Sequence, residues 1–138
     1  MKVLVDTSVW SLALRKGEKT ESEVGIVELL SELIRDTNIV IIGPIRQEIL
    51  SGISSKDKYN DLKLRLSIFK DNQLETEDYE YAAECYNICR SKGIQGSHID
   101  FLICAIAIHN NYTILTLDKD FNNYKQYIPI RTMKIESV

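Results

Sequence analysis

Residues 1–10 read MKVLVDTSVW, and the interpretation of the whole chain starts from this stretch. Residues 3–5 form an uninterrupted apolar run, which is typical of a strand buried on both faces of a sheet. Asp6 follows this run directly. The same arrangement recurs in YTILTLDKDF, residues 112–121, where Asp118 follows a second apolar run. Two carboxylates placed directly after buried strands raise the question of what they share.

Strand-like and helix-like segments alternate along the sequence. Strands are expected at residues 2–5, 39–42, around Leu74, 113–117 and 127–134. Helices are expected at residues 7–15, 20–36, 44–53, 56–70, 77–93 and 97–110, and a turn at 120–125. Such alternation implies crossover connections and a mostly parallel sheet that is covered on both faces. We therefore predict one α/β domain, residues 1–138, with helices flanking a central sheet of about four or five strands.

Composition narrows the class of protein. The formal net charge of −3 argues against a broad basic surface for duplex nucleic acid, but not against a small groove that holds cations. No apolar run reaches the roughly 20 residues that span a bilayer, and the start does not resemble a leader. Cys85, Cys89 and Cys104 lie in apolar helical patterns without a zinc-binding spacing. We expect a cytoplasmic protein with no membrane segment and with reduced core thiols.

Several carboxylates are predicted to meet at one edge of the sheet. In open α/β sheets, ligands bind outside the carboxyl ends of the strands, where Asp6 and Asp118 lie. Glu48 lies one turn into the helix that leaves the second strand, and Asp100 lies near the start of an apolar helix. Asp120 is a possible fifth acid.

Each acid also has an ordinary structural explanation. Asp6 could cap a helix, Asp118 could cap the turn that follows it, and Asp100 could interact with its helix dipole. Glu48 could be a solvated residue beside Arg46. The occurrence of all four acids at one sheet edge favours a cation-binding site over four separate caps. Two carboxylates 5 Å apart repel by roughly 3 kcal/mol at an effective dielectric constant of 20. Four such groups require a cation, or else some of them take up protons.

The ligand types indicate which cation this would be. Oxygen ligands without thiols or paired histidines select Mg²⁺ or Mn²⁺ over zinc. An acidic cage around such an ion suits phosphoryl chemistry. Thr7, Ser8 and Thr116 stand beside the acids and could hydrogen-bond a carboxylate or an ion-bound water, or could be ordinary strand-end hydroxyls.

Four motifs together resemble the PIN-domain nucleases, with the closest likeness to the VapC-type toxins of prokaryotic toxin–antitoxin pairs. They are VLVDTSVW at residues 3–10, PIRQEIL at 44–50, SHIDFLICAIAI at 97–108 and ILTLDKDF at 114–121. The resemblance implies a three-layer PIN fold, an Mg²⁺ or Mn²⁺ cofactor and endoribonuclease activity on RNA. It also implies a cognate antitoxin that wraps and inhibits the enzyme, and commonly a homodimer.

The resemblance further implies roles for particular residues. The catalytic and metal-binding acids of the family fall on Asp6, Glu48, Asp100 and Asp118. Asp120 lies where some members have an additional acid. Thr7 and Thr116 match hydroxyl positions that support the acids.

Other residues lie outside the resemblance. Arg15, Lys16 and Lys19 form a basic patch that, with Lys119 and Lys125, could contact RNA phosphates, although ordinary surface charge is favoured slightly. Trp10 is interpreted as a core residue rather than as a base-stacking one. His98 is interpreted as a surface or capping residue.

Three rival functions are distinguishable. A haloacid dehalogenase-type phosphotransfer domain needs a second aspartate two residues after the first, whereas Asp6 is followed by Thr7 and Ser8. A binding module whose acids only cap helices would be indifferent to metal. A PIN nuclease of RNA processing would have no antitoxin.

Overall fold

The centre of the fold is a parallel sheet with β1 between its two neighbours. The structure is a computed structural model and describes residues 1–135. Its strands are β1 (Val3–Val5), β2 (Ile39–Val40) and β3 (Thr113–Leu115). All of β1 is fully buried because both faces of the sheet are covered. The prediction of an α/β fold with a parallel central sheet is confirmed.

Two of the predicted strands, around Leu74 and at residues 127–134, do not form in the structure, although each segment makes one bridge to the sheet. The segment before Leu74 pairs only through Asp71 with Ile41, because β2 gives way to a helix at Gly43 and offers no further partner. The segment 127–134 pairs only through Thr132 with Ile114. Its earlier residues are still part of a turn, and Pro129 has no N–H to donate to a ladder.

The helices of the described residues mostly match the predicted ones. They are α1 (Thr7–Leu14), α2 (Glu21–Arg35), α3 (Gly43–Leu50), α4 (Lys56–Leu66), α5 (Thr76–Ser91), α6 (His98–Asn110) and α7 (Asp120–Tyr124). A capping box between Thr20 and Glu23 begins α2, and Pro44 lies in the first turn of α3. Residues 120–124 form a short helix where the sequence predicts a turn.

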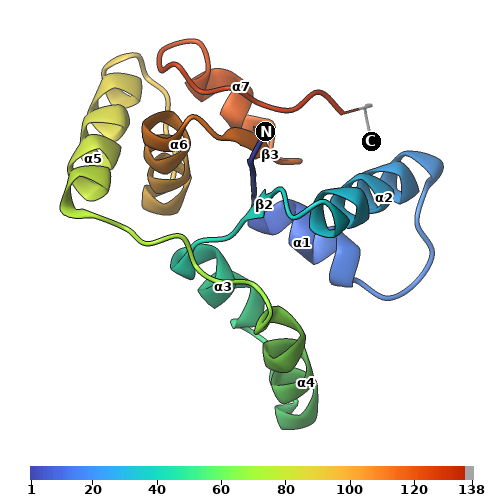
Figure 1. The fold of residues 1–138 in the computed structure, drawn as a ribbon. Helices are drawn as coiled ribbons and strands as arrows, with labels where there is room; N and C mark the ends of the chain where they lie inside the picture. The colour runs from blue at the N-terminus through green and yellow to red at the C-terminus, as the bar shows by residue number, and fades with distance from the viewer. Residues whose placement is uncertain (136–138) are drawn as a thin grey trace.

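The helices make a three-layer arrangement around the sheet, as predicted. Helices α5 and α6 lie on one side of the strands, and α1 and α2 lie on the other (Figure 1). Helix α5 packs against α6, and α1 packs against α2 and α3. Helix α4 lies at the opposite end of the molecule from α7 (Figure 1).

The core follows the apolar pattern of the sequence. Seven consecutive residues of α6, 101–107, are buried, because this helix is enclosed between β3 and α5. The three cysteines are free and buried, as predicted for core thiols. The side chain of Trp10 is only 4% exposed and packs against Phe69, which confirms its interpretation as a core residue. No helix of the described residues is long and apolar enough to cross a bilayer.

Candidate metal centre

Asp6 is held by hydroxyl groups rather than used as a helix cap. It occupies the N-cap position of α1, but its side chain makes no capping hydrogen bond. Its Oδ2 atom instead accepts hydrogen bonds from the hydroxyls of Ser8, at 2.8 Å, and Thr116, at 2.7 Å. The carboxylate is 6% exposed, so these hydroxyls provide hydrogen bonds that water would otherwise give. The capping explanation of Asp6 is therefore wrong.

The same hydroxyls tie the end of β1 to the loop that follows β3. The backbone N–H of Leu117 donates to Ser8 Oγ at 3.0 Å, and that of Asp118 donates to Thr116 Oγ1 at 3.0 Å. The bond from Leu117 to Ser8, like that from Thr116 to Asp6, connects segments more than 100 residues apart in the sequence. These bonds fix where Asp6 and Asp118 lie relative to each other.

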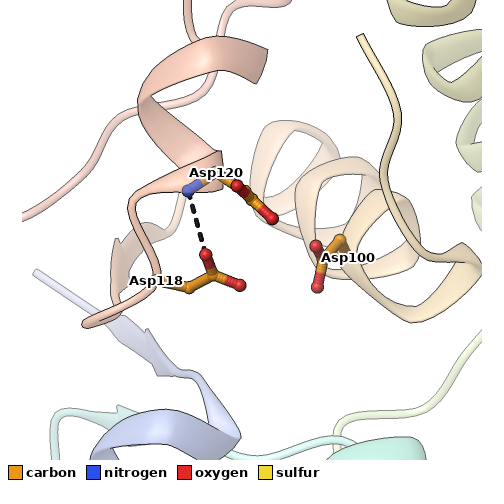
Figure 2. Close-up of side chains that lie close together, drawn as sticks. All are labelled: Asp100, Asp118 and Asp120. Carbon is orange, nitrogen blue, oxygen red and sulfur yellow. Dashed lines mark hydrogen bonds between the residues drawn. The ribbon is translucent and has the colours of Figure 1, made fainter.

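Asp118 lies on the loop between β3 and α7, and Asp120 is the first residue of α7. The backbone N–H of Asp120 donates to Asp118 Oδ1 at 2.9 Å, and Figure 2 shows this bond. The turn-capping explanation of Asp118 is thus correct for one of its oxygens. The same hydrogen bond also restricts the orientation of the Asp118 carboxylate.

Asp100 approaches from the first turn of α6. Its backbone N–H donates to the N-cap hydroxyl of Ser97 at 3.1 Å, and its Oδ2 accepts from the hydroxyl of Tyr124 at 2.6 Å. Burial raises the pKa of Asp100, and the negative charges of Asp118 and Asp6 act in the same direction. The hydrogen bonds from Tyr124 and Ser97 act against this rise. The ionised form of Asp100 is therefore disfavoured by its surroundings.

Three of these acids form one compact group. An oxygen of Asp100, one of Asp118 and one of Asp120 all lie within 4.8 Å of one another. Figure 2 shows Asp100 facing the other two carboxylates across a gap, with α6 on one side and the start of α7 on the other. Asp120, expected only as an additional acid, belongs to this group, whereas Asp6 and Glu48 do not.

Glu48 lies on α3 and is connected to the site through Thr7. The hydroxyl of Thr7 donates to Glu48 Oε1 at 2.8 Å, and Thr7 is the residue next to Asp6. Arg46 is not its partner, because the guanidinium pairs with Asp71 at 2.8 Å and also donates to the backbone carbonyl of Leu66. Glu48 is exposed, so its carboxylate can reach solvent beside the start of α1.

The negative charge of the group has no basic partner among residues 1–135. The ion pairs of the described residues involve Glu23, Asp61, Asp71 and Asp78, and none involves the acids of this site. Two carboxylates at 4.8 Å repel by about 3 kcal/mol at an effective dielectric constant near 20, and less where water screens them. A bound cation would relieve this repulsion, and the group offers only the hard oxygen ligands that Mg²⁺ and Mn²⁺ prefer.

A family comparison agrees with this geometry. The PIN domain model matches residues 3–126, which is most of the chain and includes every acid described above. The chain belongs to the PIN domain family. PIN domains are nucleases, so the acidic group lies in a fold that hydrolyses phosphodiester bonds.

Solved structures share the fold of this PIN domain. FitAcB from Neisseria gonorrhoeae superposes with a TM-score of 0.76 at 20% identity, over 96% of each chain. VapBC2 from Rickettsia felis, bound to a DNA fragment from its promoter, has a TM-score of 0.73 at 22% identity, over 96% of this chain and 98% of the other. VapBC-1 from nontypeable Haemophilus influenzae has a TM-score of 0.68 at 12% identity, over 96% of this chain and 97% of the other. No curated protein sequence matches this chain.

The basic residues considered for RNA contact lie on two separate segments of this PIN domain, after α1 and around α7. Arg15 pairs with Glu23 at 3.2 Å, and with Lys16 it lines a groove of about 400 Å³ beside α3 and α4. Both residues follow the C-terminal end of α1, about 12 Å along the helix from Asp6. Lys119 is exposed and lies between two of the clustered acids in the sequence.

The remaining surface candidates have local partners. Lys19 donates to the backbone carbonyl of Arg15 at 2.8 Å, and Lys125 donates to the hydroxyl of Thr132 at 3.1 Å. The ring of His98 is exposed and stacks on Tyr86 with ring centres 5.1 Å apart, which agrees with a surface role.

Sequence reasoning missed one residue that touches the acids, Tyr124. Burial and the hydrogen bond to Asp100 raise the pKa of the Tyr124 phenol, so its hydroxyl remains a donor. A tyrosine in an otherwise apolar core position is a weak signal that its hydroxyl has a partner. The identity of that partner depends on how α6 and α7 pack, which the sequence pattern does not reveal.

Proposed function

We propose that this PIN domain is a metal-dependent endoribonuclease that acts as the toxin of a toxin–antitoxin pair. One observation carries the proposal: three carboxylates from two separate elements converge within 4.8 Å without a basic partner among the described residues. Clustered acids that served only as caps would have no reason to face one another.

The residues of the group fit Mg²⁺ or Mn²⁺. We propose that Asp100, Asp118 and Asp120 hold the ion, with the charge of Asp6 close behind them. When bound, the ion would polarise a phosphate oxygen and lower the pKa of a water molecule, which is the chemistry that hydrolysis of a phosphodiester needs.

The other residues of the site would position these groups. Ser8 and Thr116 donate hydrogen bonds to Asp6, and Thr7 donates one to Glu48, so the orientations of these two further carboxylates are restricted. In this proposal Glu48 completes the catalytic set from α3. Lys119 is exposed and lies between two of the ligands in the sequence, so it would contact an RNA phosphate near the ion, and Arg15 and Lys16 would contact the RNA strand farther away.

The toxin assignment rests on the VapC-type motifs and on the fold shared with the FitAcB and VapBC structures. It implies a cognate antitoxin, a homodimer and a cytoplasmic location, where RNA substrates are present. A PIN nuclease of RNA processing would share the metal centre but lack the antitoxin.

Cleavage of total RNA by the purified protein tests the enzymatic part. Cleavage should occur with Mg²⁺ or Mn²⁺ and stop with a chelator. D6N and D100N should lose at least about 100-fold in rate, as when one charge-stabilising group of a catalytic site is removed. The matched control is D36N, which changes an exposed aspartate at the end of α2. RNA that stays intact, or cleavage by D100N at the wild-type rate, would contradict the proposal.

Induction in a bacterial host tests the toxin part. The wild-type chain should arrest growth and D100N should not. Co-expression of a small reading frame adjacent to this gene should restore growth, and its product should copurify with the chain. Active RNase that leaves growth unaffected would instead favour an RNA-processing nuclease.

A further inference from the structure

We infer that Tyr124 is a positioning residue of the metal centre, and that Gly96 provides the space this role requires. The inference rests on the proposed metal-binding function and concerns what orients Asp100. The hydroxyl of Tyr124 donates to Asp100 Oδ2 at 2.6 Å, within the short range of hydrogen bonds to carboxylates. It therefore restricts rotation of the carboxylate that faces Asp118 and Asp120.

The ring of Tyr124 is fixed by packing. The residue is fully buried on α7, and its ring lies 4.7 Å from that of Phe101 and 5.2 Å from that of Phe121, measured between ring centres. A side chain enclosed in this way has little rotational freedom, so its hydroxyl is held at one place. A rigid donor is what a metal-ligating carboxylate needs to keep its orientation.

Gly96 lies directly against this ring. A Cβ atom at position 96 would lie 2.7 Å from Cε2 of Phe101 and 2.8 Å from Cζ of Tyr124, and would also clash with the Tyr124 hydroxyl oxygen. Carbon atoms do not approach one another this closely, so any larger residue would displace the tyrosine. Glycine at this position thus allows the hydroxyl to reach Asp100.

The hydrogen bond also couples two elements of the site. Tyr124 is on α7, whose first residue is Asp120, and Asp100 is on α6. The bond therefore sets the separation between the ligand from α6 and those at the start of α7. Its loss should weaken metal binding before it affects the fold, because the ring would still fill its place in the core.

Calorimetric Mn²⁺ titration of Y124F tests the inference. This variant keeps the ring and removes only the hydroxyl, and we expect Mn²⁺ affinity to fall roughly 10- to 100-fold, as for other partners of metal ligands. In RNA cleavage, the Mn²⁺ concentration for half-maximal rate should rise by the same factor, and saturating Mn²⁺ should restore most of the rate. The matched control is Y112F, which removes a tyrosine hydroxyl bonded to Asn72, away from the acids; its affinity should not change.

Gly96→Ala supplies a second and independent variant. It should weaken Mn²⁺ binding by displacing the ring, and it should add little further loss in the Y124F background, because both changes act through the same hydrogen bond. Far-UV circular dichroism of each metal-free variant should match that of the wild type.

The outcomes separate the two proposals. Wild-type affinity for Mn²⁺ in Y124F would overturn the positioning role while leaving the metal centre in place. A wild-type protein that binds Mn²⁺ but cleaves no RNA would overturn the proposed function alone, and the comparison of Mn²⁺ affinities would still decide the role of Tyr124. A wild-type protein that binds no Mn²⁺ would overturn both.

Discussion

Asp100 is a residue whose charge is disfavoured by its own surroundings. Its folded-state pKa is raised chiefly by burial, so the native protein binds the proton more tightly than the unfolded chain does. The stabilising contribution of this group is fully present below the unfolded-state pKa, about 4, and is lost as the pH rises through the folded-state pKa. In metal-free buffer at pH 7, the ionised Asp100 carboxylate should therefore lower the free energy of unfolding.

This argument predicts that D100N is more stable than the wild type at pH 7 without metal, and that its advantage shrinks as the pH falls toward 4. Asparagine keeps an oxygen that can accept from Tyr124 but removes the charge. Urea unfolding with a chelator at several pH values measures the difference. D36N removes an exposed charge at the carboxyl end of α2, so its gain should stay below about 1 kcal/mol. A D100N protein that is less stable than the wild type at pH 7 would show that the carboxylate is structural.

The cysteines lead to a second prediction at this scale. Burial raises the pKa of Cys85 to about 11, and it raises the pKa values of Cys89 and Cys104 as well. Only the thiolate is reactive, and it is scarce at pH 8. A thiol reagent such as DTNB should leave the native protein unmodified at pH 8 and titrate all three cysteines in denaturant. Rapid modification of the native protein would contradict the described packing of α5 against α6.

At the scale of elements, the start of α2 is specified locally. The Thr20 side chain accepts from the backbone of Glu23 at 3.2 Å, and the Glu23 side chain accepts from the backbone of Thr20 at 2.9 Å. Thr20→Ala should cost about 1 kcal/mol of unfolding free energy, with no change in RNA cleavage. Chemical denaturation measures this cost, and Ser22→Ala, at the second position of the same helix, is the control. Equal losses in the two variants would argue against the capping box.

Elements with strong local signals were predictable from the sequence. The strand before Asp6 is a continuous apolar run, and Pro44 lies in the first turn of its helix. The helices that follow Thr20 and Ser97 each have a capping residue of the expected type. The edge segments were not predictable, because one bridge at Thr132 or Asp71 depends on where the neighbouring strand ends. That end is decided by packing rather than by propensity.

The site was predictable in its chemistry and less so in its geometry. Rules for parallel sheets indicate which acids lie at the carboxyl edge, and they led to Asp6, Asp100 and Asp118. They do not indicate that Asp120 joins Asp100 and Asp118, since that depends on residue 120 starting a short helix instead of a turn. The contact between Tyr124 and Asp100 depends on the packing of α7 against α6, which no sequence period reports.

At the scale of the whole molecule, the proposed homodimer requires an exposed apolar surface, and one such surface lies at the C-terminal end of α4. Leu64 and Ile68 are four residues apart, in the last turn of α4 and just after it, and are 71% and 74% exposed. If this surface forms the proposed homodimer, L64K/I68K should be monomeric by light scattering, while the wild type is dimeric. The control is I88K, which changes a partly exposed isoleucine on α5. A dimeric double variant would place the interface elsewhere.

The metal centre is the claim on which the functional account depends, because the fold brings like charges together without a basic partner among the described residues. The most direct measurement is thermal unfolding of the wild-type protein and of D118N over a series of Mg²⁺ concentrations. Mg²⁺ at a concentration 100 times its dissociation constant should stabilise the wild type by about 3 kcal/mol, which raises the midpoint temperature of unfolding. The midpoint of D118N should respond only weakly. An unfolding midpoint of the wild type that does not change with Mg²⁺ or Mn²⁺ would contradict the account.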